Sequence, residues 1–172
     1  MTPAISLAVS VPAFIDVEAS GLGRGSYPIE IGISLASGDR HCWLIRPPAH
    51  WTHWDPGAEA VHHISRARLI ERGRPAEEVA AELNEHLKGR IAYSDAWGND
   101  MPWVARLFDE AEMPQRFRIE SLRRLLDEAQ AAAWHASKDR IMAEVGCARH
   151  RASCDAMILQ QTWLAVSGMH GP

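Results

Sequence analysis

Lysine and cysteine are scarce in this chain of 172 residues. Only Lys88 and Lys138 are lysines among its 18 Lys and Arg residues, and its formal net charge is -4 with His neutral. Such a chain lacks the strongly basic composition of proteins that coat long nucleic acids. The cysteines are Cys42, Cys147 and Cys154. An odd, small number without a framework spacing argues for a reducing compartment.

A basic leader and a long apolar run are also missing. The apolar stretch at residues 1–15 has no basic residue before it, contains prolines and runs directly into acidic residues. It therefore predicts neither a signal peptide nor a membrane span, and we expect a cytoplasmic protein with no membrane partner. The chain shows no internal repeat or linker, and 47% of it is hydrophobic. We expect one domain over 1–172, with its core at about 12–168.

The hydrophobic pattern predicts a mixed sheet of about five strands. Residues 29–38 and 40–47 are separated by a short turn, which favours an antiparallel hairpin. The later strands arrive through helices and should be parallel, so we expect an α/β fold with helices on both faces. Residues 49–65 are expected to be irregular, and Ser153 is the expected N-cap of the last helix. Strands are predicted at 12–18, 29–38, 40–47, 90–94 and 117–121, and helices at 75–89, 99–113, 122–146 (in one or two pieces) and 153–168.

The stretch FIDVEAS, residues 14–20, places two carboxylates on a strand that otherwise looks buried. Side chains alternate along a strand, so Asp16 and Glu18 should point to the same side. They would repel each other there unless something neutralised them. On its own the pattern is weak, because two acids on an edge strand facing solvent would look the same.

Two further acids and a histidine add weight to this pair. Asp100 and Asp155 lie near the start of predicted helices, and His150 precedes Asp155 by five residues. Acidic residues at helix N-termini also complement the helix dipole, and this effect would be enough to explain Asp100 and Asp155. It would not explain two carboxylates on a core strand. Bound Mg²⁺ or Mn²⁺ would, because both ions prefer oxygen ligands.

The order of these motifs resembles the DEDDh family of 3′-to-5′ exonucleases, which includes proofreading exonucleases, RNase T and oligoribonuclease. FIDVEASGLG followed by IEIG is similar to the first motif of the family, and HRASCDA (150–156) matches its third motif, His-x-Ala-x-x-Asp. AYSDAWGNDMPWVARLF (92–108) fits the second, and HHIS (62–65) is similar to a His-Gly-Ile segment. The resemblance spans residues 14–163 and implies an RNase H-like fold.

The resemblance implies a two-metal phosphodiesterase that shortens single-stranded RNA or DNA, or short oligonucleotides, from the 3′ end. Two Mg²⁺ or Mn²⁺ ions would activate the attacking water and stabilise the attacking and leaving oxygens. Asp16, Glu18, Asp100 and Asp155 would be the metal ligands, and His150 would be the general base. Many members of the family are homodimers, so a homodimer stays open.

Departures from the family pattern concern substrate contacts and the second motif. Ala19, followed by Ser20, stands where Thr is frequent, and His63 stands in place of Gly. The family places an apolar wedge at the position of Ile64, beside the terminal base. Trp103 could stack on a base or belong to the core.

The second motif contains two aspartates, Asp95 and Asp100. We assign the motif to Asp100, because the predicted helix begins there.

Two other functions stay open on the sequence. The same site could hydrolyse a small phosphodiester, or the domain could be a nucleic-acid-binding module with weak or lost catalysis. A zinc site at Cys147, His150 and Cys154 is disfavoured because no fourth ligand lies nearby in the sequence.

Overall fold

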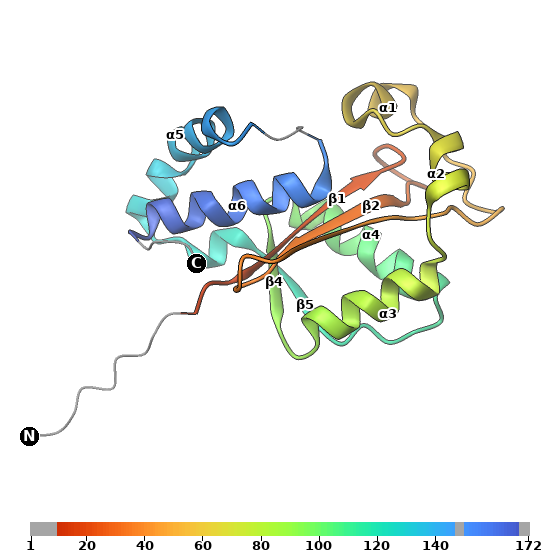
Figure 1. Cartoon of the computed structure of the whole chain (residues 1–172), viewed down its shortest axis with the longest axis horizontal. Coiled ribbons are helices and arrows are strands. Elements are labelled where there is room, and N and C mark those ends of the chain that lie inside the picture. Colours follow the sequence, from red (N-terminus) through yellow and green to blue (C-terminus); the bar gives the residue numbers. More distant parts are fainter. Residues whose placement is uncertain (1–9, 147–149, 169–172) are drawn as a thin grey trace, which may run out of the picture.

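A mixed five-stranded sheet forms the centre of the molecule (Figure 1). The computed structural model describes residues 10–146 and 150–168. Strand β1 pairs antiparallel with β2, which pairs antiparallel with β3, whereas β4 is parallel to β1 and β5 to β4. This confirms the predicted α/β fold and its strand directions. The order is β3-β2-β1-β4-β5, with bounds β1 Ala13–Ala19, β2 Pro28–Ser34, β3 Arg40–Leu44, β4 Ile91–Ser94 and β5 Arg118–Ser121.

Helices cover both faces of this sheet, as the sequence predicts. Helices α5 and α6 lie on one face, α3 and α4 on the other, and α1 and α2 lie together near one end (Figure 1). No helix in the described part of the chain is long and apolar enough to cross a membrane. The bounds are α1 Pro56–His62, α2 Arg66–Arg72, α3 Ala76–Leu87, α4 Trp97–Glu110, the 3-10 helix η1 Leu122–Leu125, α5 Glu128–Glu144 and α6 Ala152–Val166.

Strand β1 contributes to a separate apolar core on each face of the sheet. Phe14 packs with Trp134 of α5 and with Leu159 of α6, whereas Ile15 and Val17 belong to the larger core formed with α3 and α4. Because side chains alternate along a strand, the residues two and four positions after Phe14 share its face. The two carboxylates of β1 therefore face the α6 side.

Helix α6 starts in direct contact with the backbone of β2. A Cβ atom added to Gly32 would lie 2.1 Å from the backbone carbon of Ala152 and 2.1 Å from the nitrogen of Ser153. Only glycine allows the two backbones to approach this closely without one of them moving, because real Cβ atoms essentially never make such short contacts. The absence of a side chain at this point of β2 thus sets where α6 begins.

The expectation of an irregular segment at 49–65 is wrong, because α1 forms within it. Asp55 caps α1 by accepting a hydrogen bond from the amide of Gly57 at 2.8 Å, and Pro56 occupies the first turn. Aspartate followed by proline is a common way to begin a helix. Helix α2, capped by Ser65, was not predicted.

The predicted N-cap of the last helix is also wrong. Arg151 occupies the cap position without a side-chain cap bond, and Ser153 lies inside the first turn. Glu30 of β2 replaces the missing cap, because its carboxylate accepts the amide of Ala152 at 2.8 Å. A residue 122 positions away in the chain satisfies this helix end.

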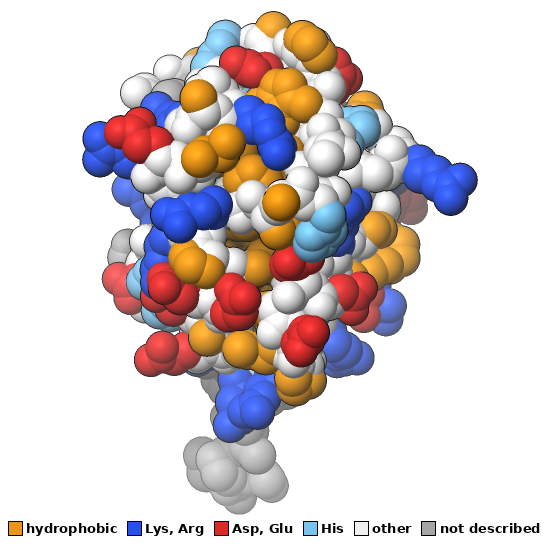
Figure 2. Space-filling model, turned by 90° about the vertical axis from the view of Figure 1, so that its right-hand side faces the viewer, with side chains coloured by type: hydrophobic (Ala, Val, Ile, Leu, Met, Phe, Trp, Pro, Cys, Tyr) orange, Lys and Arg blue, Asp and Glu red, His pale blue; other side chains and the backbone are white. Residues whose placement is uncertain are grey.

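The face that carries α1 and α2 has a mixed surface. Figure 2 shows hydrophobic side chains in patches among basic, His and acidic side chains in the upper half, and further acidic side chains lower down. Leu22, Val61 and Ile70, which belong to the turn after β1, to α1 and to α2, are 70%, 49% and 55% exposed. Charges of both signs are therefore interspersed on this face. Nothing on this face tests the homodimer, which stays open.

Candidate functional site

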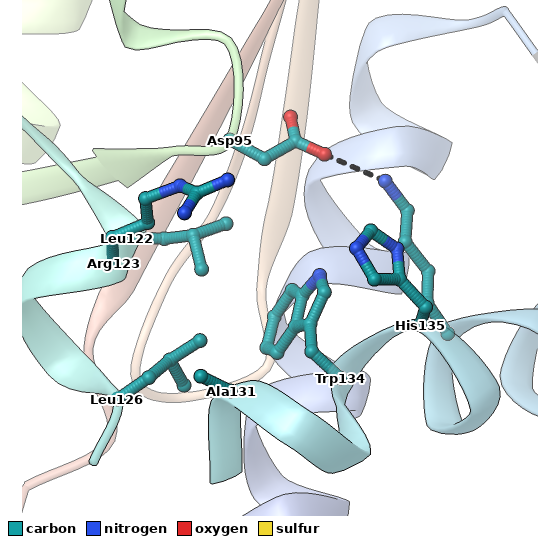
Figure 3. A pocket seen from close by; sticks show the side chains of 8 residues that line it. Asp95, Leu122, Arg123, Leu126, Ala131, Trp134 and His135 are labelled. Carbon is teal, nitrogen blue, oxygen red and sulfur yellow. Dashed lines mark hydrogen bonds and ion pairs between the residues drawn. The ribbon is translucent and has the colours of Figure 1, made fainter. Parts of the chain in front are cut away.

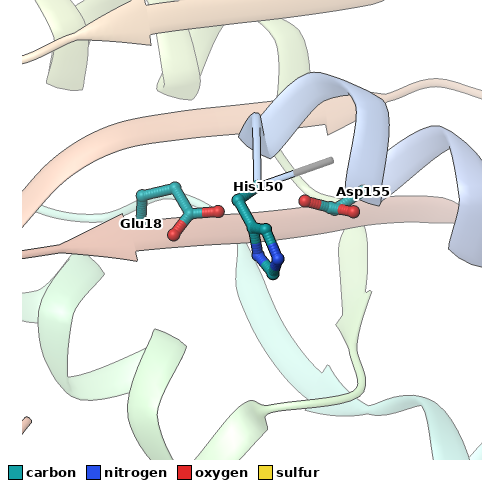
Figure 4. A group of neighbouring side chains, drawn as sticks. All are labelled: Glu18, His150 and Asp155. Carbon is teal, nitrogen blue, oxygen red and sulfur yellow. The ribbon is translucent and has the colours of Figure 1, made fainter. Parts of the chain in front are cut away.

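Three metal-ligating side chains converge at the carboxyl end of β1. Glu18 comes from β1, His150 from the segment before α6, and Asp155 from the first turn of α6 (Figure 4). One ligand atom from each lies within 4.8 Å of the other two. Two carboxylate oxygens and an imidazole nitrogen form a donor set that suits Mn²⁺ and related divalent ions. The residues present therefore fit a divalent cation.

A buried ion pair connects this group to the sheet. The Arg151 guanidinium donates to Glu30 through Nε at 3.0 and 3.1 Å and through a terminal nitrogen at 2.6 Å. Glu30 is fully buried, and it lies opposite Glu18 in the antiparallel register of β1 and β2. The pair therefore holds the chain between His150 and Asp155 directly beside the strand that carries Glu18.

His150 has an unusual backbone conformation. Its φ angle is 58°, in the left-handed region that residues with a side chain rarely adopt. Such a conformation costs on the order of 1 kcal/mol and persists when the surrounding structure imposes it. The neighbouring Arg151–Glu30 pair is one such constraint. The backbone is thus held in the shape that brings the imidazole to the two carboxylates.

Burial and mutual repulsion favour the protonated forms of the strand carboxyls. Burial raises the pKa of Asp16 well above its usual value, and the charges of Asp100, Asp155 and Glu18 raise it further. The pKa of Glu18 is raised to about 7, mainly by burial. The charges of Asp155 and Glu30 contribute to this rise, and the charge of Arg151 opposes it. A cluster that resists full ionisation is the arrangement that a divalent cation would neutralise.

Asp100 lies in the first turn of α4 and is 1% exposed. The Ser94 hydroxyl at the end of β4 donates a hydrogen bond to its carboxylate. The pKa of Asp100 is raised to about 7, mainly by burial. The Ser94 hydrogen bond opposes this rise, and the charges of Asp95 and Glu18 contribute to it. Asp100 is therefore electrostatically part of the acidic cluster.

A cavity of about 210 Å³ opens at this cluster. Asp95, the alternative for the second motif, lies on its wall, whereas Asp100 does not. Asp95 forms an ion pair of 2.6 Å with Lys138 of α5, which also lines the cavity. Lys138 was not expected here, because no local pattern connects it to a residue 43 positions earlier. The lining residues are Asp16, Val17, Glu18, Asp95, Lys138, His150, Asp155 and Leu159.

The four predicted substrate contacts do not line this cavity. Ala19 and Ile64 are buried, and Ile64 belongs to the larger core. Ser20 is fully buried, and its hydroxyl lies 3.0 Å from Nδ1 of His53. Trp103 packs against the larger core and donates its indole N–H to the Ser26 hydroxyl at 2.9 Å. Their role in substrate binding stays a prediction, which this conformation does not favour.

Comparison with solved structures shows a shared fold. The sequence matches no protein-family model and no curated protein. The structure resembles E. coli exonuclease I bound to a dA16 oligonucleotide, with a TM-score of 0.69, 11% sequence identity and 91% of this chain covered. It also resembles the zinc-bound form of the E. coli exonuclease I–ssDNA complex, with a TM-score of 0.64, 13% identity and 90% of this chain covered.

The match covers a minority of the larger protein. This chain spans 41% and 39% of the two exonuclease I chains. At such low identity the likeness establishes the RNase H-like α/β fold alone. The roles of individual residues must be argued from the site itself.

Proposed function

We propose that this chain is a metal-dependent 3′-to-5′ exonuclease that acts on single-stranded RNA or DNA or on short oligonucleotides. The observation that carries the proposal is the convergence of Glu18, His150 and Asp155 within 4.8 Å, next to the partly buried Asp16. The fold shared with an exonuclease supports the choice of phosphodiester over other metal-assisted hydrolyses.

The acidic residues have distinct roles in this proposal. Asp16, Glu18 and Asp155 would hold divalent metal ions, Mg²⁺ or Mn²⁺, and Asp100 would complete the site from the α4 side. Bound ions would activate a water molecule and neutralise the charge that develops on the phosphate oxygens. The raised pKa values of Glu18 and Asp100, both about 7, mean that metal binding at neutral pH releases protons from the cluster.

His150 would accept the proton of the attacking water. An imidazole suits this task because its ordinary pKa lies near neutral pH. His150 lies just before α6, near the Glu18 and Asp155 carboxylates, and its side chain lines the cavity. A ring nitrogen could therefore reach a water molecule bound there. A role as a third metal ligand is the competing assignment, and a variant separates the two below.

The test is a cleavage assay with 5′-labelled single-stranded RNA and DNA, in Mn²⁺ and in EDTA. We expect a ladder that shortens from the 3′ end, depends on the metal and disappears in Asp16→Ala. Asp109→Ala is the control, because this exposed aspartate of α4 lies away from the cavity. Cleavage that survives in Asp16→Ala would refute the assignment.

A small phosphodiester is the second candidate substrate, because the cavity has a volume of only about 210 Å³. Hydrolysis of bis-p-nitrophenyl phosphate without cleavage of either oligonucleotide would favour it. A binding module without catalysis would bind oligonucleotides and hydrolyse neither compound. A Mn²⁺ titration that gave no heat would support that module.

A further inference from the structure

A second cavity adjoins the carboxylate cavity. It has a volume of about 220 Å³ and lies between η1, α5 and the residue that follows β4 (Figure 3). Asp95 and Lys138 line both cavities, so their ion pair forms the common wall. A ligand held at the carboxylates could extend past this pair into the second cavity. The lining residues are Asp95, Leu122, Arg123, Leu126, Ala131, Trp134, His135 and Lys138.

The second cavity has an apolar floor. Leu122 and Trp134 are 3% and 6% exposed and belong to the core between β1, α5 and α6, with Leu126 packed against it. Leu122, Trp134 and Leu126 stand around the hollow in Figure 3. Its volume is below the range of roughly 300–1,000 Å³ in which pockets enclose drug-sized molecules. It therefore has room for one planar ring system.

The rim of this cavity carries polar side chains. Arg123 and His135 lie on opposite sides of the cavity in Figure 3. Lys138 belongs to the ion pair that forms the wall shared with the first cavity. The Arg123 side chain is exposed and forms no ion pair with any described residue. A guanidinium without an ion pair beside an apolar floor is a combination that holds the backbone and bases of a single strand.

We infer that this second cavity binds the nucleotide immediately upstream of the 3′-terminal nucleotide. The inference rests on the proposed function. The terminal nucleotide carries one phosphate, the one attacked at the carboxylates, and ends in a free hydroxyl. The Arg123 guanidinium, which lines the second cavity and has no ion pair to a described residue, matches a further phosphate, which only the upstream nucleotide has. The apolar floor would receive the upstream base.

Two substitutions test the site without disturbing the carboxylates. Ala131→Leu fills the cavity from α5 with a residue that favours helix, and Ala132→Leu is its control, because Ala132 is exposed and does not line the cavity. Arg123→Ala removes the cation that has no ion pair to a described residue. Arg124→Ala is its control, because Arg124 is the next residue of η1 and pairs with Glu120 instead.

Two ligands separate the upstream from the terminal nucleotide. An oligothymidylate has both, whereas thymidine 5′-monophosphate, the reaction product, has only the terminal one. We expect Ala131→Leu to raise KM for the oligothymidylate about tenfold, the effect of one lost base contact, and to leave the inhibition constant of thymidine 5′-monophosphate unchanged. We expect Arg123→Ala to reduce the slope of log affinity against log salt by about 0.7.

The outcomes are distinct. If the KM of the oligothymidylate and the inhibition constant of thymidine 5′-monophosphate rise equally, the cavity holds the terminal nucleotide and the inference is wrong. If Ala131→Leu behaves like Ala132→Leu on the oligothymidylate, the cavity holds no nucleotide. Affinity is also measured in EDTA, from the anisotropy of a 5′-fluorescein oligothymidylate. A parent chain that does not cleave the oligothymidylate would refute the proposed function alone. Weaker binding by Ala131→Leu and Arg123→Ala than by their controls would then still support the cavity.

Discussion

Removing the Arg151 charge should destabilise the protein more than removing the charge of its partner. Glu30 has no exposed side-chain surface, whereas 36% of the Arg151 side chain is exposed. In Arg151→Met the Glu30 carboxylate stays buried and keeps the Ala152 amide and the weakly donating Cys42 thiol, neither of which carries a positive charge. In Glu30→Gln the guanidinium can hydrate from its exposed side, and the amide oxygen can still accept a hydrogen bond. The two variants should therefore differ although they break the same pair.

The size of the effect follows from this asymmetry. Loss of one partner of a fully buried pair costs about 3–5 kcal/mol, and the exposure of Arg151 reduces this to about 2–3 kcal/mol for Arg151→Met. For Glu30→Gln we expect about 1 kcal/mol, the contribution of a weakened hydrogen bond. In a domain of this size, the loss in Arg151→Met lowers Tm by roughly 5–10 °C.

The assay is urea unfolding followed by tryptophan fluorescence in EDTA, together with calorimetric titration of Mn²⁺. Because the pair orients the segment between His150 and Asp155, we expect Arg151→Met to weaken Mn²⁺ binding about 10–100-fold, as residues behind metal ligands do. Arg140→Met, an exposed arginine of α5 with no ion pair to a described residue, is the control. The reasoning fails if Arg151→Met unfolds at the same urea concentration as the parent, or later than Glu30→Gln.

Three further predictions concern the same region. His150→Ala should lower kcat by about 10²–10⁴-fold with Mn²⁺ affinity retained, as measured by titration calorimetry, and an equal loss of affinity would make His150 a ligand. Gly32→Ala should destabilise by at least about 1–3 kcal/mol in urea unfolding, because its Cβ would collide with the start of α6; a Tm equal to the parent's would contradict that contact. Glu18 and Asp100 have pKa values of about 7 in the folded chain, above their ordinary 4.5 and 3.8, so the folded state binds more protons than the unfolded state between those limits. In EDTA the Tm should therefore fall as pH rises from about 4 to 7, and Mn²⁺ should remove this fall; a Tm that rose across the window would exclude the raised pKa values.

Several features of the site could be predicted because their signals are local. The alternation of side chains along β1 is enough to put Asp16 and Glu18 on one face. The helix pattern after β4 is enough to put Asp100 near the start of a helix. The choice of Asp100 over Asp95 rested on the same local reasoning. The structure buries Asp100 and leaves Asp95 on the cavity wall, so both contribute to the electrostatics of the cluster.

Other features could not be predicted, because they depend on contacts between distant parts of the chain. Neither Glu30 nor Arg151 carries a local sign of its partner 121 residues away. The wrong N-cap at Ser153 has the same cause, since the sequence offered a serine and the fold supplied Glu30. The burial of Ile64 in the larger core likewise depends on distant contacts, and its expected contact with substrate stays a prediction.

The sequence by itself determined the strands, most of the helices and the order of the acidic motifs, because periodicities of two and 3.6 residues are properties of neighbouring positions. Tertiary structure alone decided which of these residues meet. The close approach of α6 to Gly32 brings His150 and Asp155 to Glu18, and the position of α5 brings Lys138 to Asp95 and forms the second cavity. Those contacts depend on how the helices pack on the sheet. That packing is determined by the shapes and buried charges of side chains that lie far apart in the sequence, so no local pattern predicts it.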